Sequence, residues 1–156
     1  MGYDPDTFYE QKVVWGDHDS FQHVNNARYA RYLESARIEW MMKLGNEIGG
    51  PGRAQAMVKG EGVSLILKSL LIKFKRPVTF PDTLLIAHKP YIPQSLSHPR
   101  FHFHCRATMY SYSQRAVVAE SDSELVWYDY ESLGKCDPGP DAWDVVLRYM
   151  RPHKDL

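Results

Sequence analysis

One polar stretch of the sequence holds most of the residue types that acyl chemistry needs. The carboxylates Asp17 and Asp19 are followed by His23, and Asn25 and Asn26 come directly before a segment with helical periodicity. Backbone N–H groups at a helix N-terminus are unsatisfied donors with partial positive charge, so they stabilise negative charge that develops on a carbonyl oxygen. A carboxylate facing that carbonyl attacks it or deprotonates a water. These are the minimum parts for acyl transfer.

Each of these side chains also has an ordinary structural role available. An Asp in a loop before a helix most often caps nearby amides, which is the alternative for Asp19. Taken with the whole pattern, catalysis is the preferred interpretation of Asp19, and we interpret Asp17 as structural. His23 either takes part in the chemistry or packs beneath a loop that Asn25 and Asn26 hold.

The stretch from Trp15 to Arg37 resembles the hot-dog-fold thioesterases of the 4-hydroxybenzoyl-CoA thioesterase type. It also resembles the plant acyl-ACP thioesterases, which share the pattern Asp-x-Asp…His-Val-Asn-Asn…Tyr. The turn at 74–78 and the segment 82–84 are similar to the family's strand junction, so the resemblance covers about Phe8 to Tyr128. It implies a hot-dog fold and thioester hydrolysis.

The resemblance also implies roles for single residues. The family's catalytic carboxylate falls on Asp19, and its oxyanion donor, a backbone amide, falls on Asn26 with Asn25 beside it. His23 matches a histidine that positions or activates a water. Relatives use the carboxylate either as a nucleophile or as a general base, and both remain open here. Phe21 stands where the plant pattern has Asn, which argues against a plant-type asparagine–histidine mechanism.

A local cluster of basic residues has two interpretations. Lys73, Lys75 and Arg76, with Lys68 nearby, would suit the phosphates of coenzyme A or an acidic carrier protein. The alternative is a solvated strand face with charged gatekeepers. We name Lys73, Lys75 and Arg76, together with Asn25, as candidate substrate-binding residues.

The site needs a helix that starts after the polar stretch, and the periodicity predicts one. Apolar residues recur at three- and four-residue steps over 26–44, with Asn25 or Asn26 as N-cap and Gly45 as the stop. A flexible loop is expected at 49–52. Alternation and composition predict strands at 7–15, 62–75, 84–88, 100–110 and 116–128, and a short terminal helix at 142–150.

This element order predicts α+β architecture in a single domain over residues 1–156. We expect a hot-dog fold, in which a curved antiparallel sheet of about five strands wraps around one long central helix. Such a sheet covers only one side of the helix well. The remaining apolar surface predicts a homodimer or a dimer of dimers, formed by edge-to-edge extension of the sheet.

Composition limits the possible partners. The chain has 156 residues, 44% of them hydrophobic, as in one ordinary globular domain. Lys plus Arg and Asp plus Glu both number 19, so a nucleic-acid partner is not expected. No apolar run reaches the ~20 residues that span a bilayer. No signal or transit peptide is recognisable, so we expect a cytoplasmic protein, unless a targeting segment has been lost.

Together these observations predict an acyl-thioester hydrolase. Its substrate would be an acyl-CoA or acyl-carrier-protein thioester, and we expect it to need no cofactor and no metal. One alternative is another reaction on a thioester, such as dehydration or release of a polyketide chain, because a fold does not dictate chemistry. The other is a non-catalytic acyl-binding module.

Overall fold

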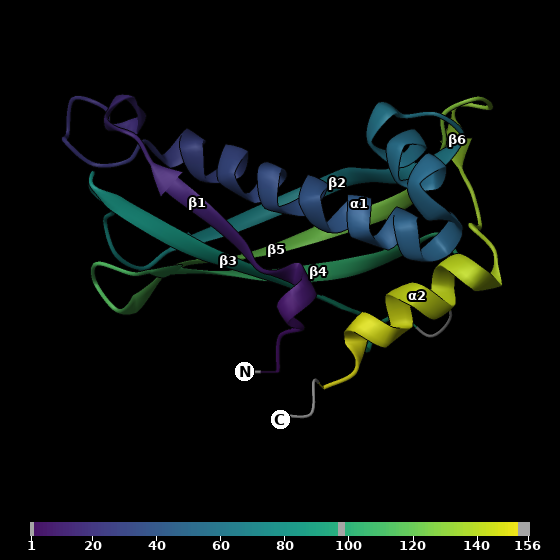
Figure 1. Ribbon diagram of the computed structural model, residues 1–156. Coiled ribbons are helices and arrows are strands. Elements are labelled where there is room, and N and C mark those ends of the chain that lie inside the picture. Colours follow the sequence, from purple (N-terminus) through teal and green to yellow (C-terminus); the bar gives the residue numbers. More distant parts are fainter. Residues whose placement is uncertain (1, 97–98, 153–156) are drawn as a thin grey trace.

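The structure, a computed structural model, describes residues 2–96 and 99–152. One long helix, α1 (Asn26–Lys59), lies along one face of a curled antiparallel sheet (Figure 1). The strands follow the order β1-β3-β4-β5-β2, and a short β6 pairs with β5. Their bounds are β1 (Tyr9–Val13), β2 (Val63–Phe74), β3 (Asp82–Tyr91), β4 (His102–Ser111), β5 (Ala116–Asp129) and β6 (Gly134–Lys135). The predicted α+β class and hot-dog fold are confirmed.

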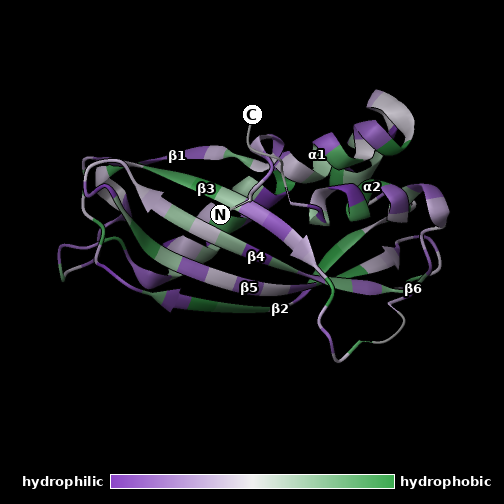
Figure 2. Cartoon of the chain, turned by 90° about the horizontal axis from the view of Figure 1, so that it is seen from below, coloured by the Kyte–Doolittle hydropathy of each residue, from purple (hydrophilic) through white to green (hydrophobic). Residues whose placement is uncertain are grey.

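The sheet has one face against the helix and one outer face, and the sequence alternates accordingly (Figure 2). In β4, Phe103, Cys105 and Ala107 are buried beneath α1, while His104 and Arg106 lie on the outer face. Side chains of successive strand residues point to opposite faces, which explains why alternation predicts these strands well. Strand β3 is longer than the predicted 84–88, because β1 pairs with residues 82–86 and β4 with residues 84–91.

The helix differs from its prediction at its C-terminal end. Gly45 does not stop α1, and the expected loop at 49–52 is a kink at Gly49 and Gly50, after which helical structure continues to Lys59. Gly45 is needed for close packing instead, since a Cβ atom there would lie 2.8 Å from the Cα of Ala54. Glycine has two uses, as a stop and as a contact point, and sequence alone does not separate them.

A second helix, α2 (Pro140–Met150), closes the kinked end of α1 (Figure 1). Tyr149 packs edge-on against Trp40, with ring centroids 5.7 Å apart, and its hydroxyl donates to Glu47. Arg148 donates to the same carboxylate at 2.5 Å. None of the helices in the described part of the chain is long and apolar enough to cross a membrane. The contacts with α2 hold the kinked half of α1 in place, and the other end of α1 carries the polar loop.

Candidate active site

The polar stretch forms a loop between β1 and α1, at the end of the helix far from the kink (Figure 1). A short 3₁₀ helix, η2 (Trp15–Asp17), turns the chain after β1, and an isolated bridge then pairs His18 with Val24. The amide of Asp19 donates to the carbonyl of His23 at 3.0 Å. The loop therefore folds back on itself before the helix begins.

Asp19 is half-buried and both of its carboxylate oxygens accept hydrogen bonds. One accepts from the amide of Phe21 at 2.9 Å, and the other from Nδ2 of Asn25 at 3.2 Å. Asn25 is the N-cap of α1, with its Oδ1 accepting from the amide of Ala27 at 2.8 Å. The structure thus places the side chain of Asn25 between the carboxylate of Asp19 and the first turn of the helix.

Asn26 is the first residue of α1, and its amide N–H has no acceptor among residues 2–96 and 99–152. Asn26 lines a cavity of about 270 Å³ together with three other predicted site residues, His23, Lys75 and Arg76. The apolar part of the lining consists of Val24, Tyr29, Phe74 and Pro77. The cavity therefore combines an unpaired helix-terminal donor with an apolar wall and a polar rim.

Asp17 is the structural residue that its position predicts. It is 7% exposed, and its carboxylate accepts from the amide of Val14 at 3.0 Å and from the hydroxyl of Tyr32 at 2.5 Å. The Nε atom of Arg28 lies 3.7 Å from it. Burial and the bond to Asp17 together raise the pKa of the Tyr32 hydroxyl, which keeps Tyr32 a donor.

Sequence reasoning missed the residues that fasten the loop to the far side of the cavity. The amide of Phe80 donates to Nε2 of His18 at 2.7 Å, and the amide of Val24 donates to the carbonyl of Val78 at 2.8 Å. His18 and Phe80 are 62 positions apart in the chain. A side chain that binds a distant backbone amide leaves no local pattern, so no sequence signal identifies this contact.

The members of the predicted basic cluster have different surroundings in the structure. Lys73 lies outside the cavity and lines a groove of about 710 Å³ on the outer face. Lys75 pairs with Glu120 at 2.9 Å and Lys68 with Glu124 at 3.0 Å. Arg76 remains at the cavity. Pairing with β5 therefore neutralises part of the positive charge that the sequence suggests.

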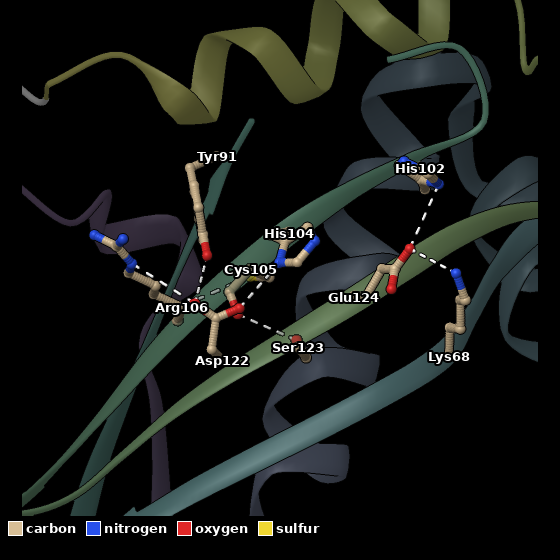
Figure 3. A network of polar contacts seen from close by, with 9 residues as sticks. All are labelled: Lys68, Tyr91, His102, His104, Cys105, Arg106, Asp122, Ser123 and Glu124. Carbon is tan, nitrogen blue, oxygen red and sulfur yellow. Dashed lines mark hydrogen bonds and ion pairs between the residues drawn. The ribbon is translucent and has the colours of Figure 1, made fainter. Parts of the chain in front are cut away.

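The densest polar network near this groove lies on the outer face of the sheet (Figure 3). Asp122 accepts from the Tyr91 hydroxyl, with Nδ1 of His104 at 3.1 Å and Nε of Arg106 at 3.8 Å. Arg106 also stacks over the ring of Tyr91 at 4.4 Å. Among the described residues, no three His, Cys, Asp or Glu side chains are grouped as a metal site. These contacts are cross-strand pairs that stabilise the sheet.

Comparison with known proteins identifies the family of the chain. The family model described as the thioesterase-like superfamily matches residues 13–147. No curated protein matches the chain significantly. Among solved structures, a 1,4-dihydroxy-2-naphthoyl-CoA thioesterase from Synechocystis is similar with a TM-score of 0.71 and 17% identity, over 93% of this chain and 98% of its own.

Two structures from Staphylococcus aureus are similar in the same way. A DHNA-CoA thioesterase has a TM-score of 0.70 and 14% identity, over 90% of this chain and 88% of its own. A hypothetical protein solved in complex with CoA has a TM-score of 0.77 and 9% identity, over 100% of this chain and 90% of its own. These likenesses show the fold, and the family match spans most of the sequence. The chain therefore belongs to the thioesterase-like superfamily and is a thioester hydrolase of the hot-dog fold.

Proposed function

We propose that the chain hydrolyses acyl-CoA thioesters, with Asp19 as the reacting carboxylate and the Asn26 amide as the oxyanion donor. One observation carries the proposal: the unpaired donor at the start of α1 lines a cavity, and Asn25 holds the carboxylate of Asp19 beside that helix end. A preorganised donor of this kind stabilises the charge that develops on a thioester oxygen. Asp19, Asn25 and Asn26 all come from one short segment of the chain.

The proposed reaction uses the Asn26 amide in the cavity lining and Asp19, which is outside that lining and bonded to the N-cap Asn25. The thioester carbonyl points its oxygen at the Asn26 amide, and Asp19 either deprotonates a water that attacks the carbon or attacks it directly. The tetrahedral intermediate then expels the thiolate of coenzyme A, which takes up a proton. In the direct route, water cleaves the resulting anhydride. Both routes release a carboxylic acid and free coenzyme A. His23 lines the cavity and would position the water.

Coenzyme A is the preferred carrier for two reasons. Arg76 and Lys75 lie at the cavity and would meet its phosphates. Two of the structural relatives are named as acting on aromatic acyl-CoA thioesters, and the third was solved with CoA. The small volume of the cavity, about 270 Å³, favours a compact acyl group such as a short or aromatic one. Lys73 faces the other groove and has no part in this proposal.

Thiol release from a panel of acetyl-, benzoyl-, long-chain acyl-CoA and acyl-carrier-protein thioesters tests the proposal. Asp19→Ala should lower turnover by about 10²-fold or more. Asp144→Ala, at an exposed position on α2, is the matched control and should retain wild-type turnover.

Turnover by Asp19→Ala near the wild-type rate would overturn the assignment of Asp19. Preference for the carrier-protein thioester would overturn the choice of coenzyme A. Tight acyl-CoA binding without thiol release would instead indicate an acyl-binding module. An unsaturated product detected by mass spectrometry would indicate dehydration.

A further inference from the structure

The buried carboxylate of Asp17 is held by groups from both sides of the loop. The amide of Val14, at the end of β1, donates to it at 3.0 Å, and the hydroxyl of Tyr32, on α1, donates at 2.5 Å. A buried carboxylate is tolerated only when hydrogen bonds replace its lost water. Because Asp17 is 7% exposed, these bonds determine where its backbone lies.

That backbone leads directly to Asp19. The carbonyl of Asp17 accepts from the amide of Asn25 at 2.9 Å. The side chain of Asn25 in turn donates to Asp19 at 3.2 Å while it caps α1. A continuous series of hydrogen bonds therefore runs from Tyr32 through Asp17 and Asn25 to Asp19.

The series begins at a rigid point and ends in a loop with little packing of its own. Tyr32 is 3% exposed and belongs to the core cluster beneath the first half of α1. In the loop, by contrast, Trp15 is 75% exposed and Phe21 is 81% exposed. Val24, which is 3% exposed, anchors the end of the loop in the core, whereas the part of the loop around Asp19 is placed mainly by polar contacts.

We infer that Tyr32 and Asp17 are positioning residues, which set the place of the Asp19 carboxylate relative to the Asn26 amide without touching substrate. This inference rests on the proposed function of Asp19. Displacement of a reacting group by about 1 Å lowers a rate by on the order of 10²-fold, so a small shift of the loop has a large effect.

Tyr32→Phe tests the inference, because it removes one hydroxyl and leaves the ring. We expect kcat to fall by on the order of 10- to 100-fold with KM unchanged. Tyr149→Phe is the matched control, since it removes an equivalent hydroxyl–carboxylate bond, to Glu47, at the far end of the molecule. Both variants should lose similar thermal stability, but Tyr149→Phe should keep wild-type kcat.

Two further measurements separate positioning from general stability. Asp17→Asn keeps an acceptor for Val14 and Tyr32, so it should retain more kcat than Asp17→Ala. The side-chain amide resonance of Asn25 in a ¹H–¹⁵N spectrum should shift in Tyr32→Phe and stay in place in Tyr149→Phe.

The resonance does not depend on turnover, so it separates failure of this inference from failure of the proposed function. An unshifted Asn25 resonance in Tyr32→Phe would overturn the series of contacts, whatever the activity. If Asp19→Ala abolishes turnover while Tyr32→Phe retains wild-type kcat, Asp19 stands and the positioning role is wrong. If Asp19→Ala keeps turnover, the proposed function fails, and a shifted Asn25 resonance would still establish the physical link.

Discussion

Asp17 and Asp19 are two residues apart, yet their surroundings give them different tasks. Asp17 is buried and accepts from a backbone amide and a tyrosine hydroxyl. Asp19 is half-buried, and its partners are the loop amide of Phe21 and the side chain of Asn25. A carboxylate fixed on all sides serves structure, whereas one at a partly open position is available for chemistry.

Phe74 is expected to limit the length of the acyl group. It lines the cavity and packs edge-on against Tyr29, with ring centroids 4.9 Å apart. Phe74→Ala should raise kcat/KM for long-chain acyl-CoA relative to benzoyl-CoA by about 10-fold, because removing the ring enlarges the cavity. Phe8→Ala, at a similarly exposed phenylalanine away from the cavity, is the control. An unchanged ratio in Phe74→Ala would show that the acyl group lies elsewhere.

His88 should make stability depend on pH. It is 4% exposed, stacks on Trp40, and its Nδ1 has no hydrogen-bond partner among residues 2–96 and 99–152. Burial, helped by the nearby charge of Arg37, lowers its pKa to about 3. Between the ordinary histidine pKa of about 6.5 and that value, only the unfolded chain takes up the proton, so the free energy of unfolding falls with pH by about 1.4 kcal/mol per unit.

Urea unfolding from pH 7.5 to pH 5 checks this linkage, because the uptake of about one proton on unfolding changes the free energy of unfolding measurably over this range. His88→Phe should lose less stability than the wild type as the pH falls below about 6.5. Above about pH 7 the two curves should run parallel, which serves as the internal control. Parallel curves over the whole range would contradict a neutral, buried His88.

Sequence predicts only the part of the site whose residues lie in one segment of the chain. The structural interpretation of Asp17 follows from its position in the polar stretch before the helix, and its hydrogen bonds agree with that interpretation. The contact between His18 and Phe80 could not be predicted, because it joins a side chain to a backbone amide 62 positions away in the chain. Lys73 appears beside Lys75 in the sequence, but only Lys75 lines the cavity, and no sequence pattern indicates that difference.

At the scale of elements, α1 shows why boundaries are harder to predict than types. Helical periodicity identifies its first half, and the N-cap Asn25 marks its start. The second half has Gly49, Gly50 and Pro51 at its beginning, a composition typical of loops. The helical segment after the kink therefore has no strong sequence signal. It forms because its packing against the rest of the fold overrides local propensity.

Gly45→Ala is expected to destabilise the chain. Its new Cβ would lie 2.8 Å from the Cα of Ala54, and backbone atoms cannot move aside as a flexible side chain would. Overpacking of this kind costs about 1–3 kcal/mol in the free energy of unfolding. Urea denaturation measures the loss. Gly52→Ala has open space around it and should be neutral or stabilising, and equal effects of the two substitutions would contradict the packing argument.

At the scale of the whole molecule, the sheet has two edges with different properties. β1 is an edge of five residues, whereas β2 has 12 residues and pairs only with β5 in the described part of the chain. Leu71 and Leu67 of β2 are 58% and 38% exposed. Long apolar edges are ready templates for pairing with another chain. We expect β2 to pair with β2 of a second copy.

Leu71→Lys should weaken this homodimer. Sedimentation should give the wild type about twice the protomer mass of 18.1 kDa, and a charge on the edge strand should shift the equilibrium toward the monomer. Leu133→Lys, at a leucine that is 71% exposed beyond β5, should keep the wild-type mass. A wild-type mass of one protomer would exclude the dimer.

The two fastenings of the site loop differ in how far they reach along the chain. Asp17 and Tyr32 are 15 positions apart, whereas His18 and Phe80 are 62 apart. We therefore expect that local opening of the β2–β3 loop would break the second contact and leave the first in place. We expect the amide of Phe80 to exchange its hydrogen with solvent much faster than the amide of Val14. The carboxylate that we propose to react would then stay aligned when the contact between His18 and Phe80 is broken.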